Sequence, residues 1–258
     1  MEPVKRFLDI VTSLTVAFAM ILVGGGLPYL RPVAGAIAYV GGVKNNNGNA
    51  SNCTMTYTPA TGNTYDIIVG ISGTAAVVTS ITATGNTFVQ KAFSSNGNTR
   101  SEIWGVLSGT STTSFQANVD IGGSDIVCIF VEHSGVVAYG AATNSITGTS
   151  TTPSVDLTTQ DSNNFVIGGH AGRFNSAPTA GTGNLRNADF VSATDRVGAG
   201  ATDNTAGSPS LVTNSVTGDG SQVWASCAIE LRSTTGGAQS ATAKITGAVK
   251  VTGAVKIK

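Results

Sequence analysis

The feature that most constrains this fold is a series of short apolar or alternating runs separated by turn residues. Gly and Asn fill many of the breaks, and both tolerate the positive φ angles of tight hairpins. Alternation places successive side chains on opposite faces, as in a β-strand. Charged residues are only 11% of the chain, so the strong helix formers Glu, Lys and Arg are scarce. We expect strands at residues 65–72, 77–83, 87–93, 101–107, 114–121, 126–133, 165–170, 188–193, 211–216 and 222–231.

These runs predict an all-β protein, a two-sheet antiparallel sandwich over residues 53–233. The stretch 126–131 is apolar throughout, which predicts a central strand covered on both faces. The last run alternates, with Cys227 and its odd-numbered neighbours on one face. Residues 77–107 are expected to form a three-stranded antiparallel meander. The number of short strands favours a jelly-roll-like sandwich, with an immunoglobulin-like sandwich as the alternative.

Residues 1–38 have the pattern of an export segment. Lys5 and Arg6 precede an apolar stretch at residues 7–27. Gly residues and an acid interrupt this stretch, which suits a signal peptide better than a spanning helix of ~20 residues. Small residues at 36–38 offer a cleavage site. A retained membrane anchor and a buried structural segment are the alternatives, and the membrane is a partner only if the segment stays uncleaved.

Residues 39–52 are expected to be a linker or an N-terminal strand, because the stretch 45–52 is rich in Asn and Gly. Residues 234–243 are rich in Gly, Ser, Thr and Ala and predict a flexible tether. The tether leads to a C-terminal segment, residues 244–258, that contains Thr-Gly-Ala-Val-Lys twice.

The C-terminal segment has the pattern of one long amphipathic strand. Its apolar face and its basic face are formed, respectively, by Ile245, Val249, Val251, Val255 and Ile257, and by residues that include Lys250 and Lys256. A single strand leaves its backbone groups unpaired, so this segment needs a partner. It can form a hairpin at Thr252-Gly253, complete an edge of its own sandwich, or pair with a neighbouring subunit.

The charge distribution favours the neighbouring subunit. Residues 45–233 carry six basic and twelve acidic side chains, a net charge of −6, whereas residues 234–258 carry +4. A basic strand is attracted to an acidic body. The formal net charge of the whole chain is +0, so no basic face for a nucleic acid is expected. Copies of the chain itself are therefore the expected partners.

Residue types that carry catalysis do not form a recognisable constellation. His133 and His170 have no partner motif, and no Ser lies in a Gly-x-Ser-x-Gly elbow. No spacing selects an acid–base pair, so we expect no enzyme and no catalytic residue. The acids considered for such a pair are Glu102, Glu132, Asp189 and Asp195.

Cofactors and metals are not expected, although exported sandwiches often hold calcium in loops. Asp203, Asn204 and Asp219 are the oxygen donors considered for such a loop site. The Cys count is odd. Cys128 and Cys227 lie in apolar strands, so buried thiols are the first expectation and a bridge between them is the alternative.

Sugar binding is the rival function. Sandwich modules bind glycans through aromatic rings and polar loops. The loop at residues 172–178 offers Arg173, Phe174 and Asn175, and Trp224 is a second aromatic candidate. These residues predict the alternative of a secreted carbohydrate-binding or adhesion module.

The order of the runs resembles a β-sandwich module found in exported bacterial surface proteins and in phage structural proteins. Short signatures such as Gly-Asn-Thr-Phe at 85–88 and Glu-His-Ser-Gly at 132–135 carry the resemblance. It extends over the segments 67–72, 81–88, 102–106, 126–135, 165–169 and 224–231. The resemblance implies surface display, adhesion or virion structure, and no catalytic residue. We therefore expect a structural subunit of an extracellular, cell-surface or virion-surface assembly that associates by strand pairing.

Overall fold

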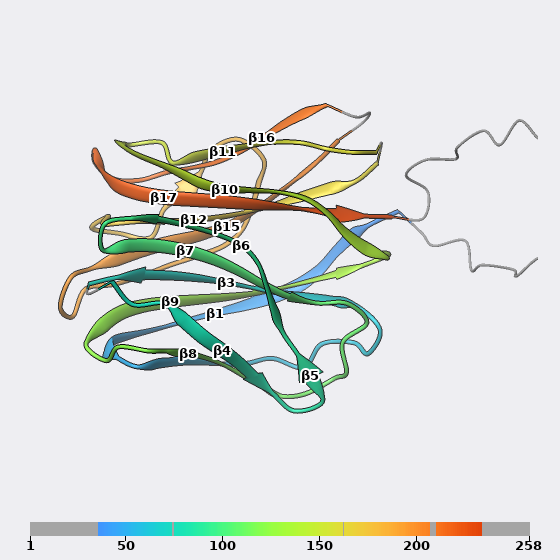
Figure 1. Ribbon diagram of the computed structural model, residues 1–258, viewed down its shortest axis with the longest axis horizontal. Helices are drawn as coiled ribbons and strands as arrows, with labels where there is room; N and C mark the ends of the chain where they lie inside the picture. Colours follow the sequence, from blue (N-terminus) through green and yellow to red (C-terminus); the bar gives the residue numbers. More distant parts are fainter. Residues whose placement is uncertain (1–35, 74, 162, 207–209, 234–258) are drawn as a thin grey trace, which may run out of the picture.

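The computed structural model describes residues 36–73, 75–161, 163–206 and 210–233 (Figure 1). The predicted all-β class is confirmed, because the elements of these residues are strands in antiparallel sheets. The predicted apolar segment up to residue 35, the tether and the C-terminal segment lie outside the described residues.

Four sheets lie one above another, where the sequence predicted two (Figure 1). The N-terminal repeat, residues 36–134, has an outer sheet of β2 (Asn52–Thr56), β8 (Ser114–Val119), β4 (Val78–Ala83) and β5 (Asn86–Thr87). Its inner sheet has β1 (Ala38–Ala50), β9 (Ser124–Ser134), β3 (Thr64–Ser72), β7 (Thr99–Val106) and β6 (Val89–Asn96). Within each sheet the strands are given in the order in which they pair.

The C-terminal repeat, residues 138–233, lies against the N-terminal repeat through its own inner sheet. This sheet has β10 (Ala138–Ser150), β17 (Gln222–Arg232), β12 (Phe165–Gly172), β15 (Val197–Thr205) and β14 (Asn184–Val191). The outer sheet has β11 (Ser154–Thr158), β16 (Leu211–Thr217) and β13 (Thr179–Ala180). Both ends of the described chain lie on the right of Figure 1.

The two repeats are the same arrangement of strands. Both sheets are reproduced when β10 to β17 replace, in chain order, the strands β1, β2, β3, β4, β6, β7, β8 and β9. Among the strands of the described residues, β5 alone has no counterpart. Corresponding backbone hydrogen bonds also recur. Tyr57 N donates to Thr113 O as Thr159 N donates to Ser210 O, each closing one end of the outer sheet. The chain therefore contains an internal structural repeat.

An approximate two-fold axis relates the repeats. Strand β6 packs against β10 and β17, and its counterpart β14 packs against β1 and β9. The axis passes between β3 and β12, where corresponding residues meet. A Cβ atom on Gly169 would lie 3.1 Å from Cγ2 of its counterpart Ile68. A Cβ atom on Gly70 would lie 2.5 Å from Ala199 Cβ, so the two inner sheets approach too closely for larger side chains here.

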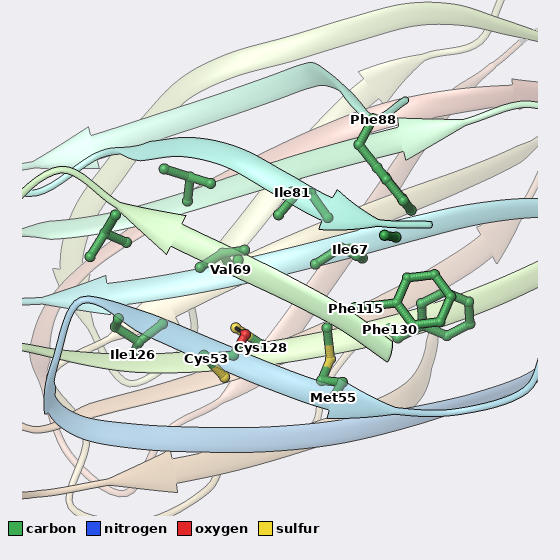
Figure 2. Close-up of a cluster of buried hydrophobic side chains, with 14 of the residues drawn as sticks. Cys53, Met55, Ile67, Val69, Ile81, Phe88, Phe115, Ile126, Cys128 and Phe130 are labelled. Atoms are coloured by element: carbon green, nitrogen blue, oxygen red, sulfur yellow. Dashed lines mark hydrogen bonds between the residues drawn. The ribbon is translucent and has the colours of Figure 1, made fainter. Parts of the chain in front are cut away.

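Three apolar cores separate the four sheets. The N-terminal core is aromatic, and Figure 2 shows the rings of Phe115 and Phe130 together, with centroids 4.6 Å apart. The middle core, between the inner sheets, is built from aliphatic and small side chains such as Ile129 and Ala199. The C-terminal core is smaller and includes Val155, Leu157, Val166, Ala206, Val212 and Ala228.

All ten predicted runs contain strands. β9 pairs with β1 and β3 and is buried on both faces, which confirms the predicted central strand. The predicted meander over residues 77–107 is wrong. β4 and β5 belong to the outer sheet, whereas β6 and β7 belong to the inner sheet. The chain crosses between the sheets at Phe88, whose side chain is buried in the N-terminal core. Residues 77–107 are therefore divided between two sheets and cannot form one meander.

Candidate functional site

The outer sheets of the two repeats differ at one edge, which is β2 in the N-terminal repeat and β11 in the C-terminal repeat. In the N-terminal repeat this edge is β2, whose odd-numbered residues pair with β8 and whose even-numbered backbone groups point outward. Side chains of β1 cap the outward carbonyls. Asn45 Nδ2 donates to Thr54 O at 2.6 Å, and Asn47 Nδ2 donates to Asn52 O at 2.9 Å. The stretch with linker-like composition is thus a strand that closes a sheet edge.

The corresponding edge of the C-terminal repeat, β11, does not have these caps. β1 pairs with β9 in the N-terminal repeat as β10 pairs with β17 in the C-terminal repeat. In this alignment, Ile146 and Gly148 of β10 correspond to Asn45 and Asn47 of β1. Neither residue has a side-chain amide that could donate a hydrogen bond. No described side chain donates to the outward carbonyls of β11, which belong to Ser154, Asp156 and Thr158. We call this outward side of residues 154–158 the β11 edge.

An apolar floor lies beside the β11 edge. Val155 and Leu157 point inward into the C-terminal core, and Ala141 and Ile146 of β10 pack against that core while partly exposed. On the outer face, the side chain of Asp156 is exposed and accepts a hydrogen bond of 2.6 Å from Thr213 Oγ1. The edge therefore combines backbone groups that point away from the sheet, apolar side chains on its inner face and a carboxylate on its outer face.

The opposite edge of the same sheet is partly closed. β13 pairs with β16 only at Val216 and Thr217. Next to it, Ser215 N donates to Thr182 O at 3.0 Å, and Asn204 Nδ2 donates to Thr213 O at 3.1 Å. An Asn side chain again caps an outward carbonyl, as Asn45 and Asn47 do in the N-terminal repeat.

The residues predicted to contact a glycan do not form an aromatic platform. Phe174 is fully buried, and Trp224 is 7% exposed, so neither ring is available for stacking on a sugar. A Cβ atom on Gly172, Gly198 or Gly218 would lie within 3.1 Å of the Phe174 ring, which explains these glycines.

Arg173 lies in an open polar recess of about 250 Å³ together with Ser192, Thr194, Asp195 and Arg196. Arg173 pairs with Asp195 at 3.3 Å, and Arg196 Nη1 donates to Asn175 Oδ1. The recess offers two guanidinium groups and two hydroxyl groups to a polar ligand.

The carboxylate of Asp125 connects the two repeats through backbone N–H groups of residues that line this recess. It accepts backbone N–H groups of Asn49 and of all four residues from Ala193 to Arg196. Burial favours the neutral acid, but these donors outweigh it and lower the pKa of Asp125. Arg196 has a φ of 51°, in the left-handed region, and in this conformation its N–H donates to the Asp125 carboxylate at 2.8 Å.

A second set of polar contacts crosses between the inner sheets. Tyr139 Oη donates to Asp66 Oδ1 at 2.8 Å, and burial raises the pKa of Asp66 to about 6. His133 Nε2 lies 3.2 Å from Asp203 Oδ2, which also accepts from Arg186 Nε at 2.6 Å. Burial opposes ionisation of Asp203, but its hydrogen bonds from His133, Arg186 and Asn184 lower the pKa of this acid.

His170 and Glu132, which the sequence offered as candidates for catalysis, are buried and hydrogen-bonded within the fold. His170 is buried between Ser226 Oγ at 2.9 Å and Thr202 Oγ1 at 3.0 Å, and burial lowers its pKa to about 3. Glu132 accepts from Asn63 Nδ2, and its counterpart Glu230 accepts from Asn164 Nδ2, both at 2.6 Å.

Glu102 is buried and accepts from Val78 N at 3.0 Å and from Trp104 Nε1 at 2.8 Å. Asp189 accepts from Asn46 Nδ2. Among the described residues, no contact joins any two of the four acids considered for an acid–base pair, which are Glu102, Glu132, Asp189 and Asp195.

The donors considered for a calcium loop are dispersed. Asp203 and Asn204 lie in strand β15 and point to opposite faces, and Asp219 accepts from Asn175 N instead. Within the described ranges, no group of three or more His, Cys, Asp or Glu side chains could hold a metal ion. These ranges also contain no helix long and apolar enough to cross a membrane.

Cys128 and Cys227 are free, as is Cys53, and all three are buried. Cys128 faces the N-terminal core and Cys227 faces the middle core, so the alternative of a bridge between them is not formed. Burial raises the pKa of Cys227 to about 12 and that of Cys128 well above its ordinary value.

No family model, curated protein or solved structure matches this chain. The resemblance to modules of exported bacterial and phage proteins therefore stays an expectation from the sequence.

Proposed function

We propose that this protein is a non-enzymatic structural subunit of an extracellular or virion-surface assembly, in which copies associate by β-strand pairing. The observation that carries the proposal is the strand order, which occurs twice. With strands numbered one to eight in each repeat, the inner sheets begin 1-8-3-6 and the outer sheets 2-7-4. From this order we infer a jelly-roll-like architecture, which is common in viral capsid and lectin domains.

The C-terminal segment supplies the means of association. Its Val and Ile residues alternate with Lys over residues 244–258, and the described body carries an excess of acidic side chains. Strand addition uses backbone hydrogen bonds for affinity and alternate side chains for specificity. A subunit that offers both a strand and a sheet edge can form filaments or layers without further components.

Electron microscopy and sedimentation of the purified full chain test this function. We expect large, salt- and heat-resistant assemblies, and a chain shortened by residues 240–258 should remain a monomer. As a control, Lys250→Arg keeps the alternation and should assemble normally. Unchanged assembly of the shortened chain would contradict the proposal.

A glycan-binding or adhesion module is the second candidate, and the polar recess at Arg173 and Arg196 favours it. Two guanidinium groups beside hydroxyl groups suit an acidic sugar. Glycan-array binding that is lost in Arg196→Ala, by a chain that stays monomeric, would select this candidate over the structural one.

A further inference from the structure

We propose that the β11 edge accepts the C-terminal segment, residues 244–258, of a second copy of the chain. This inference rests on the proposed function and names the surface that the function needs. The edge is identified by comparison within the molecule, since the corresponding edge of the N-terminal repeat is capped by Asn45 and Asn47.

The backbone of β11 is arranged for an added strand. Thr159 N donates to Ser210 O, and Val216 N donates to Pro153 O, so the odd-numbered residues of β11 pair with β16. The N–H and C=O groups of Ser154, Asp156 and Thr158 therefore point away from the sheet. An incoming strand finds a row of donors and acceptors over five residues, the usual length of a strand.

The side chains next to this edge match the two faces of the C-terminal segment. An added strand would lie over β10, where Ala141 and Ile146 provide an apolar floor continuous with the C-terminal core. Val and Ile residues of the segment, such as Val249 and Val251, fit that floor. Its Lys residues would then face outward, on the side that carries the exposed carboxylate of Asp156.

The proposed function requires the segment to come from a second copy, because pairing with its own β11 would occupy the edge without joining two subunits. The fifteen residues of the segment span ~50 Å when extended, whereas the five residues of β11 span about 17 Å. The ten-residue tether, rich in Gly, Ser, Thr and Ala, gives the segment the reach to leave its own subunit.

A proline substitution tests the acceptor edge. Asp156→Pro removes one outward N–H group without breaking the ladder to β16, because proline is tolerated on an edge strand. We expect about tenfold weaker association of the full chain, from the lost hydrogen bond and the blocked strand. Thr54→Pro is the matched control, because Thr54 has the same position on the capped edge of β2, and it should assemble normally. Equal loss in both variants, or in neither, would overturn the proposal.

Disulfide trapping keeps the proposal testable if the proline variant fails to fold. One full-length population carries Asp156→Cys and a second carries Lys250→Cys, and the native thiols are buried. We expect a bond between the two populations on mild oxidation. Combining both substitutions in one chain and obtaining only an internal bond would overturn the second copy as the source.

The two proposals can fail separately. If the chain without residues 240–258 stays monomeric but no bond forms at position 156, the acceptor edge is wrong and the proposed function stands. If the shortened chain assembles as before, the proposed function fails, and the β11 edge loses its occupant with it.

Discussion

The outer sheets of the two repeats have the same strand order, but the sheet edge is capped in the N-terminal repeat and open in the C-terminal repeat. In the N-terminal repeat, β4 pairs with β8 from Val78 to Thr82, and Asn side chains cap β2. In the C-terminal repeat, β13 pairs with β16 over two residues, and β11 has no such caps among the described residues. The inner sheets are closely matched, so the difference is confined to the outer surface.

This difference indicates which repeat contributes more to the stability of the fold and which repeat can bind a partner. The N-terminal core receives Val78, Ile81 and Phe88 from the β4–β5 region, whereas the described residues of the C-terminal core include none from β13. Burial of apolar area is the main favourable term in folding. We infer that the N-terminal repeat supplies more of the folding free energy, and that the C-terminal repeat is the one able to present an edge.

The largest effect should come from truncating the two cores. Phe115 contacts the rings of Tyr65, Phe88 and Phe130, so Phe115→Ala should lower the free energy of unfolding by about 3–5 kcal/mol. Leu157→Ala in the C-terminal core should cost about 2–3 kcal/mol, because fewer neighbours are lost. Urea denaturation followed by Trp fluorescence measures both. A larger loss for Leu157→Ala would break the comparison.

The sequence predicted the strands that carry strong apolar patterns and missed those that do not. β9 and β17 were predictable because alternation or continuous apolar residues mark them. β15 was missed because Gly198, Ala199 and Gly200 have low strand propensity. Ala199 lies where the two inner sheets approach closely, whereas Gly198 and Gly200 make room for Phe174 and Val216 on the opposite face, and these are tertiary demands. The prediction of two sheets failed because alternation identifies strands but does not show which strands pair, so it cannot distinguish two sheets from four.

The candidate site was half predictable. The C-terminal segment is visible as an alternating pattern, so a donor strand could be proposed from residues 244–258. The acceptor edge has no sequence signal. It depends on Ile146 and Gly148 standing in register where the other repeat has Asn, which only the strand pairing reveals. The predicted glycan residue Phe174 was a loop aromatic by sequence, and its burial comes from packing on three glycines.

A second effect concerns pH, because the two repeats bury titratable groups of opposite type. The pKa of Asp66 is raised from 3.8 to about 6, so stability from this group falls as pH rises through that window. The pKa of His170 is lowered from 6.5 to about 3, so stability from this group is lost as pH falls through 6.5. Each slope is about 1.4 kcal/mol per pH unit, and they oppose each other between roughly pH 4 and 6.

Single substitutions should separate these slopes. Asp66→Asn should leave a chain that loses about 1.4 kcal/mol for each unit of acidification below pH 6, because His170 then acts alone. His170→Gln should give the opposite slope over the same range. Urea denaturation at several pH values measures both. Parallel pH curves for the two variants would show that these buried groups do not differ as the structure indicates.

The smallest effect should come from making the N-terminal edge like the C-terminal one. Asn45→Ile with Asn47→Gly copies the residues of β10 onto β1 and removes two hydrogen bonds to β2. The free energy of unfolding should fall by about 1 kcal/mol for each bond lost. The outward groups of β2 would then be open, so Thr54→Pro, harmless in the native chain, should weaken association in this background. If Thr54→Pro still has no effect there, uncapped backbone alone does not make an acceptor, and the apolar floor beside β11 is the deciding feature.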